Sequence, residues 1–424
     1  MKNTLHEAYV ALLKNELIPA LGCTEPIAVA YVAATARRIL GMMPEHMVVK
    51  CSGNIIKNVK GVKVPNAGEM RGIEASAILG MIGGNPDLAL EVLNAVREED
   101  VIKTAQLLET GLCKTEKLNS DAPLHIVVEM TAGSQSVEVE LRDGHTNIVR
   151  ITKNGEVLLD HNDKAKDEDG NSRYYPRFTL EDILDFADQV DLDEIAPVLE
   201  RQIQCNMQIA EEGLRNRYGA NVGKTILAQD QDNVEVQAKA FAAAGSDARM
   251  SGCILPVVIN SGSGNQGMTV SLPVICYAKY YQVPHEKLLR ALLVSNLIAI
   301  YQKSALGTLS AFCGAVCAAT GSGAGIAYMM DGRKEIIEKT IINTLANVAG
   351  IVCDGAKSSC AAKIASCVDA AIMGYKMALR GNTYHSGEGL VKSDLDGTIQ
   401  TIMNMGRVGM HNTDQVILDL MIQS

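Results

Sequence analysis

Two cysteines that bracket a short polar loop are the first candidates for metal chemistry in this sequence. Cys353 and Cys360 enclose Asp-Gly-Ala-Lys-Ser-Ser, and the loop lies between two helical patterns. Thiols on such a loop can converge on one iron-sulfur cluster. Cys313 lies upstream between glycine-rich breaks that let the backbone approach a bulky ligand, so it is a candidate third ligand.

The other thiols have a simpler interpretation. A free cysteine is most often a small buried apolar residue, and that alternative applies to the three candidate ligands as well. We expect it for the cysteines that lie within helical or strand-like runs, which are Cys51, Cys113, Cys205, Cys253, Cys276, Cys317 and Cys367.

A further cysteine lies beside a predicted helix N-terminus. Cys23 precedes Thr24-Glu-Pro26, in which Thr24 is typical of an N-cap and Pro26 of a first turn, and Gly41 predicts the helix end. A helix N-terminus stabilises a thiolate, so Cys23 is a candidate general base or nucleophile. The alternative is a thiol that only caps the helix.

A glycine-rich loop and a lysine are candidates for binding a carboxylate. The loop Asn260-Ser-Gly-Ser-Gly-Asn-Gln-Gly267 offers amide groups at the start of a helix. Its glycine spacing fits neither a dinucleotide fingerprint nor a Walker loop, and an ordinary turn is the alternative. Lys357, between two candidate ligands, is placed to balance cluster charge or contact substrate, but a surface lysine has the same pattern.

The periodicity of the chain predicts the elements that must position these residues. Alternation with period two from His125 to Leu159 predicts an antiparallel sheet, and Val48 to Cys51 predicts a further short strand. Residues 160–172 are typical of an exposed loop, and helical patterns fill the chain from about residue 196. We therefore predict a mixed α/β (α+β) protein: a mostly helical catalytic domain of residues 1–117 and 197–424, with a small α/β domain inserted at 118–196.

Composition excludes several classes of protein. The net charge of −10 and the absence of a Lys/Arg cluster argue against nucleic acid as a partner. The uncharged stretch Ser304 to Met330 is long enough for a membrane span, but its glycines and serines favour a buried, closely packed segment without a continuous helix. The N-terminus lacks a signal-peptide pattern, so we expect a cytoplasmic protein whose eleven cysteines are mostly reduced.

Six motifs, taken together, resemble a known family. They follow one another in the family's order and cover nearly the whole chain: Gly22-Cys-Thr-Glu-Pro26, Ser52-Gly-Asn54, Ser246-Asp-Ala-Arg249, Ser261-Gly-Ser-Gly-Asn-Gln266, Ser310-Ala-Phe-Cys-Gly314 and Cys353-Asp-Gly-Ala-Lys-Ser-Ser-Cys360. The pattern is similar to that of the L-cysteine desulfidases, which are related to the α part of iron-sulfur L-serine dehydratases.

This resemblance implies a set of site residues. It implies a [4Fe-4S] cluster bound by Cys313, Cys353 and Cys360, with the fourth iron open to substrate, and it implies that Cys23 is the base. It also implies a substrate-binding role for the polar loops, which we extend to Asn54, Ser263, Gly264, Asn265, Gln266 and Lys357. Two departures from the serine dehydratase pattern are the closer spacing of Cys353 and Cys360 and the absence of cysteine from the tail, Asp419 to Ser424.

These residues lead to a mechanistic hypothesis and its rivals. The open iron acts as a Lewis acid on the carboxylate and β-leaving group of L-cysteine while Cys23 removes the α-proton. Elimination gives pyruvate, ammonia and sulfide, or water in place of sulfide if L-serine is the substrate. The rivals are a pyridoxal-phosphate lyase, an amino-acid-binding sensor and a structural zinc protein. The sequence leaves a homo-oligomer open.

Overall fold

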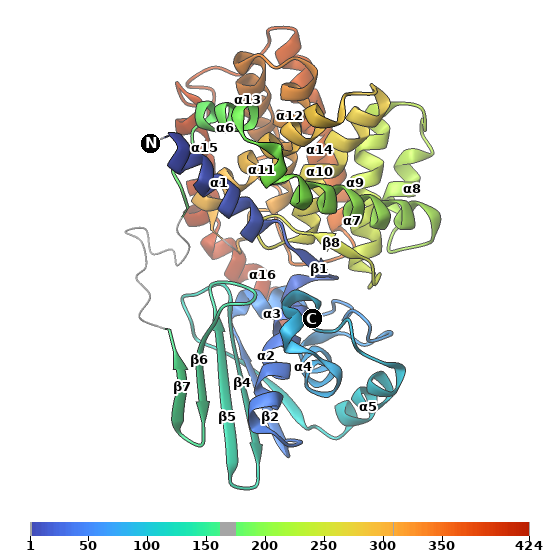
Figure 1. Ribbon diagram of the computed structural model, residues 1–424, viewed down its shortest axis with the longest axis vertical. Coiled ribbons are helices and arrows are strands. Elements are labelled where there is room, and N and C mark those ends of the chain that lie inside the picture. Colours follow the sequence, from blue (N-terminus) through green and yellow to red (C-terminus); the bar gives the residue numbers. More distant parts are fainter. Residues whose placement is uncertain (1, 162–174, 308, 424) are drawn as a thin grey trace.

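A computed structural model of the protein describes residues 2–161, 175–307 and 309–423. Figure 1 shows two lobes, an upper one of packed helices and a lower one in which helices cover one face of a sheet. The predicted α+β class, with a mostly helical body and a smaller sheet-bearing part, is confirmed. Most of the loop predicted at 160–172 lies outside the described residues.

The sheet of the lower lobe is mostly antiparallel. Its strands are β2 (His46–Cys51), β3 (Cys113–Lys117), β4 (His125–Ala132), β5 (Gln135–Arg142), β6 (Ile148–Lys153) and β7 (Glu156–Asp160). They are ordered β3-β2-β4-β5-β6-β7, and β2 and β3 run parallel. The register aligns Val49 with Val128 and Val128 with Val139, and all three are buried on the face that helices cover. The predicted antiparallel sheet between His125 and Leu159 is therefore present.

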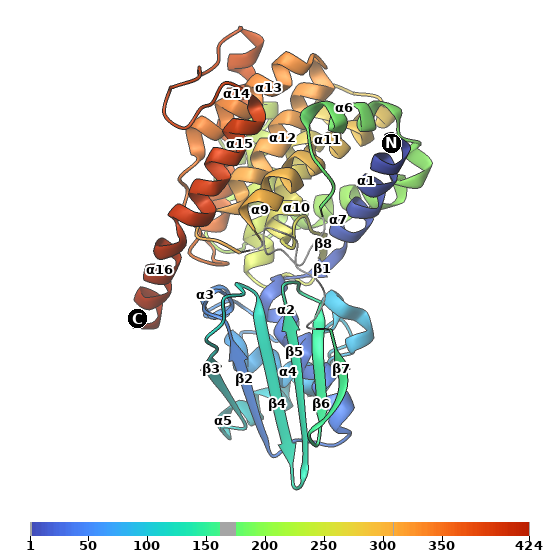
Figure 2. The same ribbon diagram turned by 90° about the vertical axis from the view of Figure 1, so that its left-hand side faces the viewer.

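Helices from earlier in the chain cover this sheet. The lower lobe also holds α2 (Thr24–Leu40), α3 (Gly53–Val59), α4 (Gly72–Gly83), a short 3-10 helix (Pro86–Glu91) and α5 (Glu98–Glu109). Val29 and Ala33 of α2 share one apolar core with Ile78 of α4 and the strands. Figure 2 shows the opposite, uncovered face of the sheet toward the viewer.

The structure distributes the two lobes differently from the predicted domain ranges. We predicted the sheet domain at 118–196, but β2, β3 and α2 to α5 precede it in the sequence. At the other end, Ile183 and Phe186 of α6 (Leu180–Gln189) belong to the core of the helical lobe. Local periodicity detects a strand or a helix, but it does not say which of two cores buries it.

Long helices form the upper lobe. They are α1 (Lys2–Glu16), α6, α7 (Ala196–Arg215), α8 (Val222–Leu227), α9 (Val234–Met250), α10 (Gly264–Tyr280), α11 (His285–Leu306), α12 (Gly314–Met330), α13 (Lys334–Val348), α14 (Cys360–Leu379), α15 (Leu395–Asn404) and α16 (His411–Gln423). Short turns of helix occupy Leu192–Glu194 and Met405–Gly409. Thr179 caps α6 by accepting a hydrogen bond from the Asp182 amide.

Helix α12 corrects one expectation about the uncharged stretch Ser304 to Met330. Its glycines do not interrupt the helix, which is continuous and buried from Gly314 to Met330. A Cβ on Gly321 would lie 2.4 Å from the Ser295 carbonyl oxygen of α11, so glycine permits the close approach of the two helices. Crossing a membrane requires a longer apolar helix than any in the described ranges.

Several contacts join the lobes, including a strand pair, a side-chain hydrogen bond and a helix packing. The strand β1 (Pro19–Leu21) pairs antiparallel with β8 (Pro256–Val258) of the upper lobe, directly before α2 begins. The Thr24 hydroxyl donates a hydrogen bond to the Gly262 carbonyl oxygen at 2.9 Å. The C-terminal helix α16 packs on α3, as Figures 1 and 2 both show. Residues from both chain ends therefore meet where the lobes touch.

Candidate functional site

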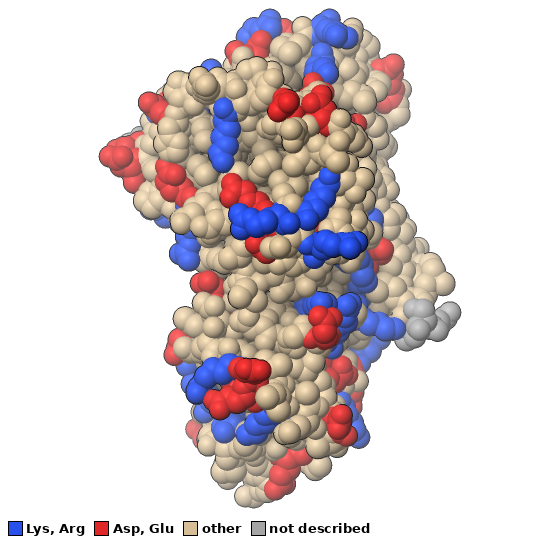
Figure 3. Space-filling view, turned by 90° about the vertical axis from the view of Figure 1, so that its right-hand side faces the viewer, with Lys and Arg blue, Asp and Glu red and all other residues tan. Residues whose placement is uncertain are grey.

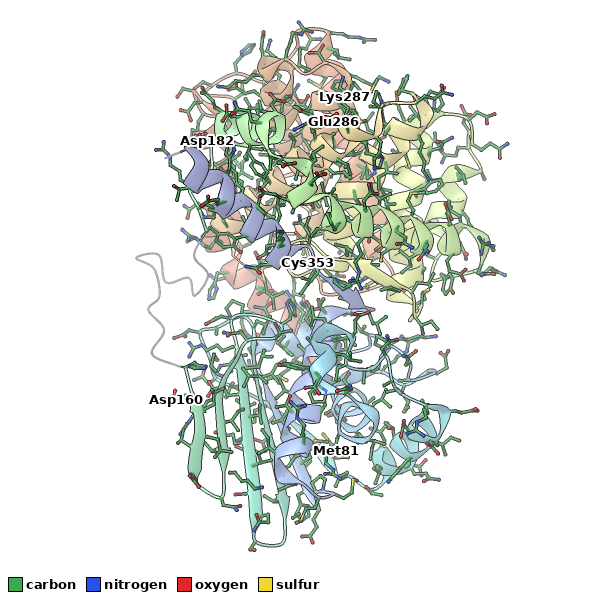
Figure 4. The ribbon with its side chains drawn as sticks, viewed as in Figure 1. Met81, Asp160, Asp182, Glu286, Lys287 and Cys353 are labelled. Atoms are coloured by element: carbon green, nitrogen blue, oxygen red, sulfur yellow. The ribbon has the colours of Figure 1, made fainter. Side chains whose placement is uncertain are left out.

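Two of the candidate ligands are brought together by backbone pairing. The amide of Cys313 donates to the Ile351 carbonyl at 3.0 Å, and the amide of Cys353 donates to the Ala311 carbonyl at 2.7 Å. The thiols lie side by side, and their hydrogen bond raises the pKa of Cys313 and lowers that of Cys353 to about 6. Figure 4 places Cys353 at the junction of the lobes.

The third candidate ligand begins the next helix. Cys360 is the first residue of α14, and its sulfur accepts a hydrogen bond from the Lys357 amide at 3.4 Å. The loop before it turns at Gly355, where φ is +88° and a Cβ would lie 2.7 Å from the Lys57 carbonyl oxygen. A side chain at this position would separate the loop from α3, so glycine holds Cys360 close to the lower lobe.

Cys313, Cys353 and Cys360 differ from the other cysteines in accessibility. They are partly exposed, whereas the eight remaining cysteines are buried, and all eleven are free thiols. Seven of those eight were predicted to be core residues, and their burial agrees with that prediction. The accessible surface of the three is directed at a cavity of about 100 Å³, whose lining they share with Cys23.

This donor set fits an iron-sulfur cluster better than a single ion. In the described ranges, no group of three or more His, Cys, Asp and Glu side chains is arranged to bind one metal ion. Thiolates that bind a cluster coordinate different iron atoms and so need not converge on one point. Three accessible thiols around one cavity meet that requirement, and none of them is engaged in a disulfide.

Cys23 occupies the predicted helix end, but its pKa moves opposite to our expectation. It is the N-cap residue of α2 and is 2% exposed. We expected the helix end to lower the pKa of Cys23. Burial raises it instead, and the neighbouring charge of Glu25 raises it further, while the charge of Arg249 acts in the opposite direction. Desolvation outweighs the helix end because the thiol is fully enclosed.

Glu25 is the direct partner of Cys23. The Cys23 thiol donates a hydrogen bond to Glu25 Oε2 at 3.1 Å, and the Thr24 hydroxyl oxygen lies 3.0 Å from the same oxygen. The Asn58 side-chain amide donates to Glu25 Oε1 at 2.9 Å. Burial alone would raise the pKa of Glu25, but the charge of His145, the Cys23 hydrogen bond and Arg249 lower it. Glu25 is thus a carboxylate that positions the Cys23 thiol by accepting its hydrogen bond.

Three of the predicted substrate-binding residues line the cavity, and three do not. Ser263, Asn265 and Gln266, at the start of α10, belong to its lining. Gly264 begins α10 and lies against the guanidinium of Arg249. Asn54 lines a larger neighbouring cleft of about 640 Å³, and the Lys357 ammonium donates to the carbonyl oxygens of Lys57 and Ala356.

That larger cleft adjoins the cavity. Ser261, Lys303, Leu309 and Ser310 line both spaces, while α16 contributes Asp414 and other residues to the larger one. Figure 3 shows basic and acidic side chains interspersed over one face of the molecule, with basic side chains near the junction of the lobes.

Several polar residues of the cavity were not singled out as site residues from the sequence. They are Glu25, Lys57, Asn58, His145, Arg249 and Lys303. Two lie within motifs that carried the family resemblance, Gly22-Cys-Thr-Glu-Pro26 and Ser246-Asp-Ala-Arg249, so a signal was present for them. His145 lies in the Asp143-Gly144 turn between β5 and β6, where its pattern is that of an ordinary hairpin turn.

Comparison with known proteins adds an independent observation. Residues 87–419 match the family model described as serine dehydratase alpha chain. A UPF0597 protein of Lachnoclostridium phytofermentans is 55% identical over 418 residues, which cover 99% of this chain and 100% of that protein. UPF0597 proteins of Treponema denticola and Bacteroides fragilis are 47% and 38% identical, with 98% or more of both chains covered in each case.

Proposed function

This chain belongs to the serine dehydratase alpha chain family, and on that basis we propose that it is a cluster-dependent lyase that eliminates the β-substituent of L-cysteine. The products are pyruvate, ammonia and sulfide. One observation carries the proposal: Cys23, a buried thiol with a carboxylate partner, lines the same small cavity as Cys313, Cys353 and Cys360. A base and a set of cluster ligands around one substrate-sized space match this chemistry.

Cys313, Cys353 and Cys360 would hold a [4Fe-4S] cluster. When bound, the cluster supplies a Lewis-acidic iron that polarises the substrate's carboxylate and leaving group. Lys57 is 2% exposed, and its charge lowers the pKa of Cys353, so it favours the thiolate form that a metal requires. With three thiolates from this chain, one iron of such a cluster would be left without a cysteine ligand.

The proton step belongs to Cys23. The hydrogen bond of 3.1 Å to Glu25 orients the Cys23 sulfur, and the charge of Arg249 favours the thiolate, the form that acts as the base. The thiolate then removes the α-proton of the substrate while the Cβ–S bond breaks and the sulfur leaves as hydrosulfide. The remaining aminoacrylate tautomerises to an imine, and water hydrolyses it to pyruvate and ammonia.

L-serine is the second candidate substrate, because the family description names serine. The same residues would eliminate water in place of hydrosulfide. One feature favours cysteine, namely the short spacing of Cys353 and Cys360, which departs from the serine dehydratase pattern.

Anaerobic turnover by cluster-reconstituted protein tests the proposal. L-cysteine and L-serine are supplied separately, without pyridoxal phosphate, and pyruvate and sulfide are measured together with iron and zinc content. We expect equal amounts of pyruvate and sulfide from cysteine. Pyruvate from serine alone would assign the protein to the dehydratases. A colourless zinc protein that releases no pyruvate would contradict the lyase altogether.

A further inference from the structure

We propose that Arg249 binds the α-carboxylate of the substrate and so selects carboxylate-bearing amino acids, an inference that rests on the proposed function. Arg249 lies near the C-terminal end of α9 and lines the cavity. It is 3% exposed, and its Nε has no hydrogen-bond partner within the described part of the chain. A buried guanidinium nitrogen that lacks a hydrogen-bond partner carries a desolvation cost, which an anionic ligand would offset.

The packing of Arg249 directs it toward the start of α10. A Cβ on Gly264 would lie 2.4 Å from Arg249 Nε and 2.9 Å from its Cζ, so the guanidinium rests directly on this glycine. Gly264 is the first residue of α10, where backbone N–H groups and the helix dipole also favour an anion. A planar fork beside a helix N-terminus matches the geometry of a carboxylate.

The ammonium group of an amino acid also has potential hydrogen-bond acceptors in this cavity. The side-chain oxygens Asn58 Oδ1, Asn265 Oδ1 and Gln266 Oε1 line or border it, and each is buried without a hydrogen-bond partner among the described residues. Such oxygens accept hydrogen bonds from an ammonium group. A cation on one side and three amide oxygens together accommodate a zwitterion.

Arg249 differs from the neighbouring Lys57, because Lys57 already forms an ion pair with Asp414. A competing role for Arg249 is to balance the charge of the cluster, since its charge also acts on Cys360. The two roles have different consequences. Loss of a carboxylate ligand weakens carboxylate binding alone, whereas loss of a cluster counter-charge reduces cluster content and affects every ligand.

Two half-substrates separate these roles. 3-Mercaptopropionate carries the thiol and carboxylate of cysteine, and cysteamine carries its thiol and ammonium. Their affinities are measured by calorimetry on anaerobic, reconstituted wild type, Arg249→Gln and the control Arg333→Gln, whose surface guanidinium pairs with Asp331. Cluster absorbance and circular dichroism are recorded for each protein.

We expect Arg249→Gln to bind 3-mercaptopropionate about 10- to 100-fold more weakly, the cost of a lost charged hydrogen bond, and to bind cysteamine as wild type does. Arg333→Gln should match wild type with both probes. Gly264→Ala, which displaces the guanidinium without removing it, should show the same selective loss. If Arg249→Gln does not fold, Arg249→Lys, which keeps the charge but not the fork, is judged by the same measurement.

Unchanged affinity for 3-mercaptopropionate, equal weakening of both probes, or loss of cluster absorbance in Arg249→Gln would each overturn the proposal. The binding experiment does not depend on turnover. If wild-type protein turns over neither cysteine nor serine, the proposed function is wrong. The affinities for the two half-substrates still decide whether Arg249 binds a carboxylate.

Discussion

The Cys23 thiol donates a hydrogen bond to the Glu25 carboxylate at 3.1 Å, within the first turn of a helix whose start forms the wall of the cavity. Burial and the charge of Glu25 raise the pKa of this thiol, so an isolated thiolate is disfavoured. The charge of Arg249 acts in the opposite direction and favours the thiolate that the proposed base requires. Glu25 positions the Cys23 sulfur, and Arg249 offsets part of the cost of its charge.

Replacing Glu25 with glutamine tests this pairing. Glutamine keeps the shape of the side chain but removes the negative charge that raises the pKa of Cys23, so the pKa of Cys23 should fall. We expect activity to rise with pH from a lower pH than in wild type, with cluster absorbance retained. The measurement is a pH–rate profile, and a profile identical to that of wild type would contradict the pairing of Glu25 with Cys23.

Single serine replacements test the ligand assignment. Cys313→Ser, Cys353→Ser and Cys360→Ser should each lose most of the reconstituted iron and inorganic sulfide, because serine is a poor ligand for iron-sulfur clusters. Cys205→Ala, at a buried position on α7 outside the cavity, is the control and should keep full cluster content. Normal cluster content in any of the three serine variants would remove that residue from the ligand set.

The burial of Asp247 predicts that the free energy of unfolding depends on pH, and this dependence does not require the cluster. It is 1% exposed, and burial raises its pKa to about 6 from 3.8. The folded state therefore holds this proton more tightly than the unfolded state, and stability is lost as pH rises from about 4 to about 6. Asp247→Asn should be more stable than wild type at pH 7 by up to about 3 kcal/mol, the free energy of that pKa shift.

Urea unfolding of cluster-free protein at pH 4, 5, 6 and 7 measures this difference. The difference in the free energy of unfolding between Asp247→Asn and wild type should increase with pH and become constant above about pH 6. A difference that does not change over this range would show that Asp247 does not titrate there.

The ion pair between Lys57 and Asp414 predicts how α16 is held. Lys57 lies on α3 and is 2% exposed, and Asp414 lies on α16. Asp414→Asn leaves a buried ammonium without its counter-charge, which costs several kcal/mol at such positions. We expect lower stability and faster hydrogen exchange over residues 411–423. The control is Asp419→Asn on the same helix, because the Asp419 carboxylate accepts its hydrogen bond from the exposed Gln415. This variant should change neither stability nor hydrogen exchange. Equal exchange rates in the two variants would contradict the proposal that the Lys57–Asp414 ion pair holds α16.

Cys23, Cys313, Cys353 and Cys360 were singled out from local context and resemblance, and the structure places all four around one cavity. Asn54 lines the adjoining cleft, because a loop's polarity does not reveal which of two adjoining spaces it faces, and Lys357 contacts backbone carbonyl oxygens beside the cavity. The sheet was predicted from period-two alternation, but its pairing with β3 depends on contacts between distant segments.

The direction of the Cys23 pKa shift could also not be predicted from the sequence alone. A helix N-terminus can be recognised from Thr24 and Pro26, and it favours a thiolate. Whether that effect dominates depends on how completely the thiol is enclosed, and distant loops such as 260–267 decide this. Arg249 was missed as a site residue for the same reason, because its burial without a partner cannot be read from an alanine-rich helix pattern.

The central claim is that Cys23 removes the α-proton beside a cluster held by the other three thiols. The most direct test is reconstituted Cys23→Ala, incubated anaerobically with L-cysteine in D₂O, with α-deuterium incorporation and pyruvate measured against wild type. The account predicts wild-type cluster absorbance, no pyruvate and no deuterium at the α-carbon. Pyruvate release by Cys23→Ala at the wild-type rate would contradict it.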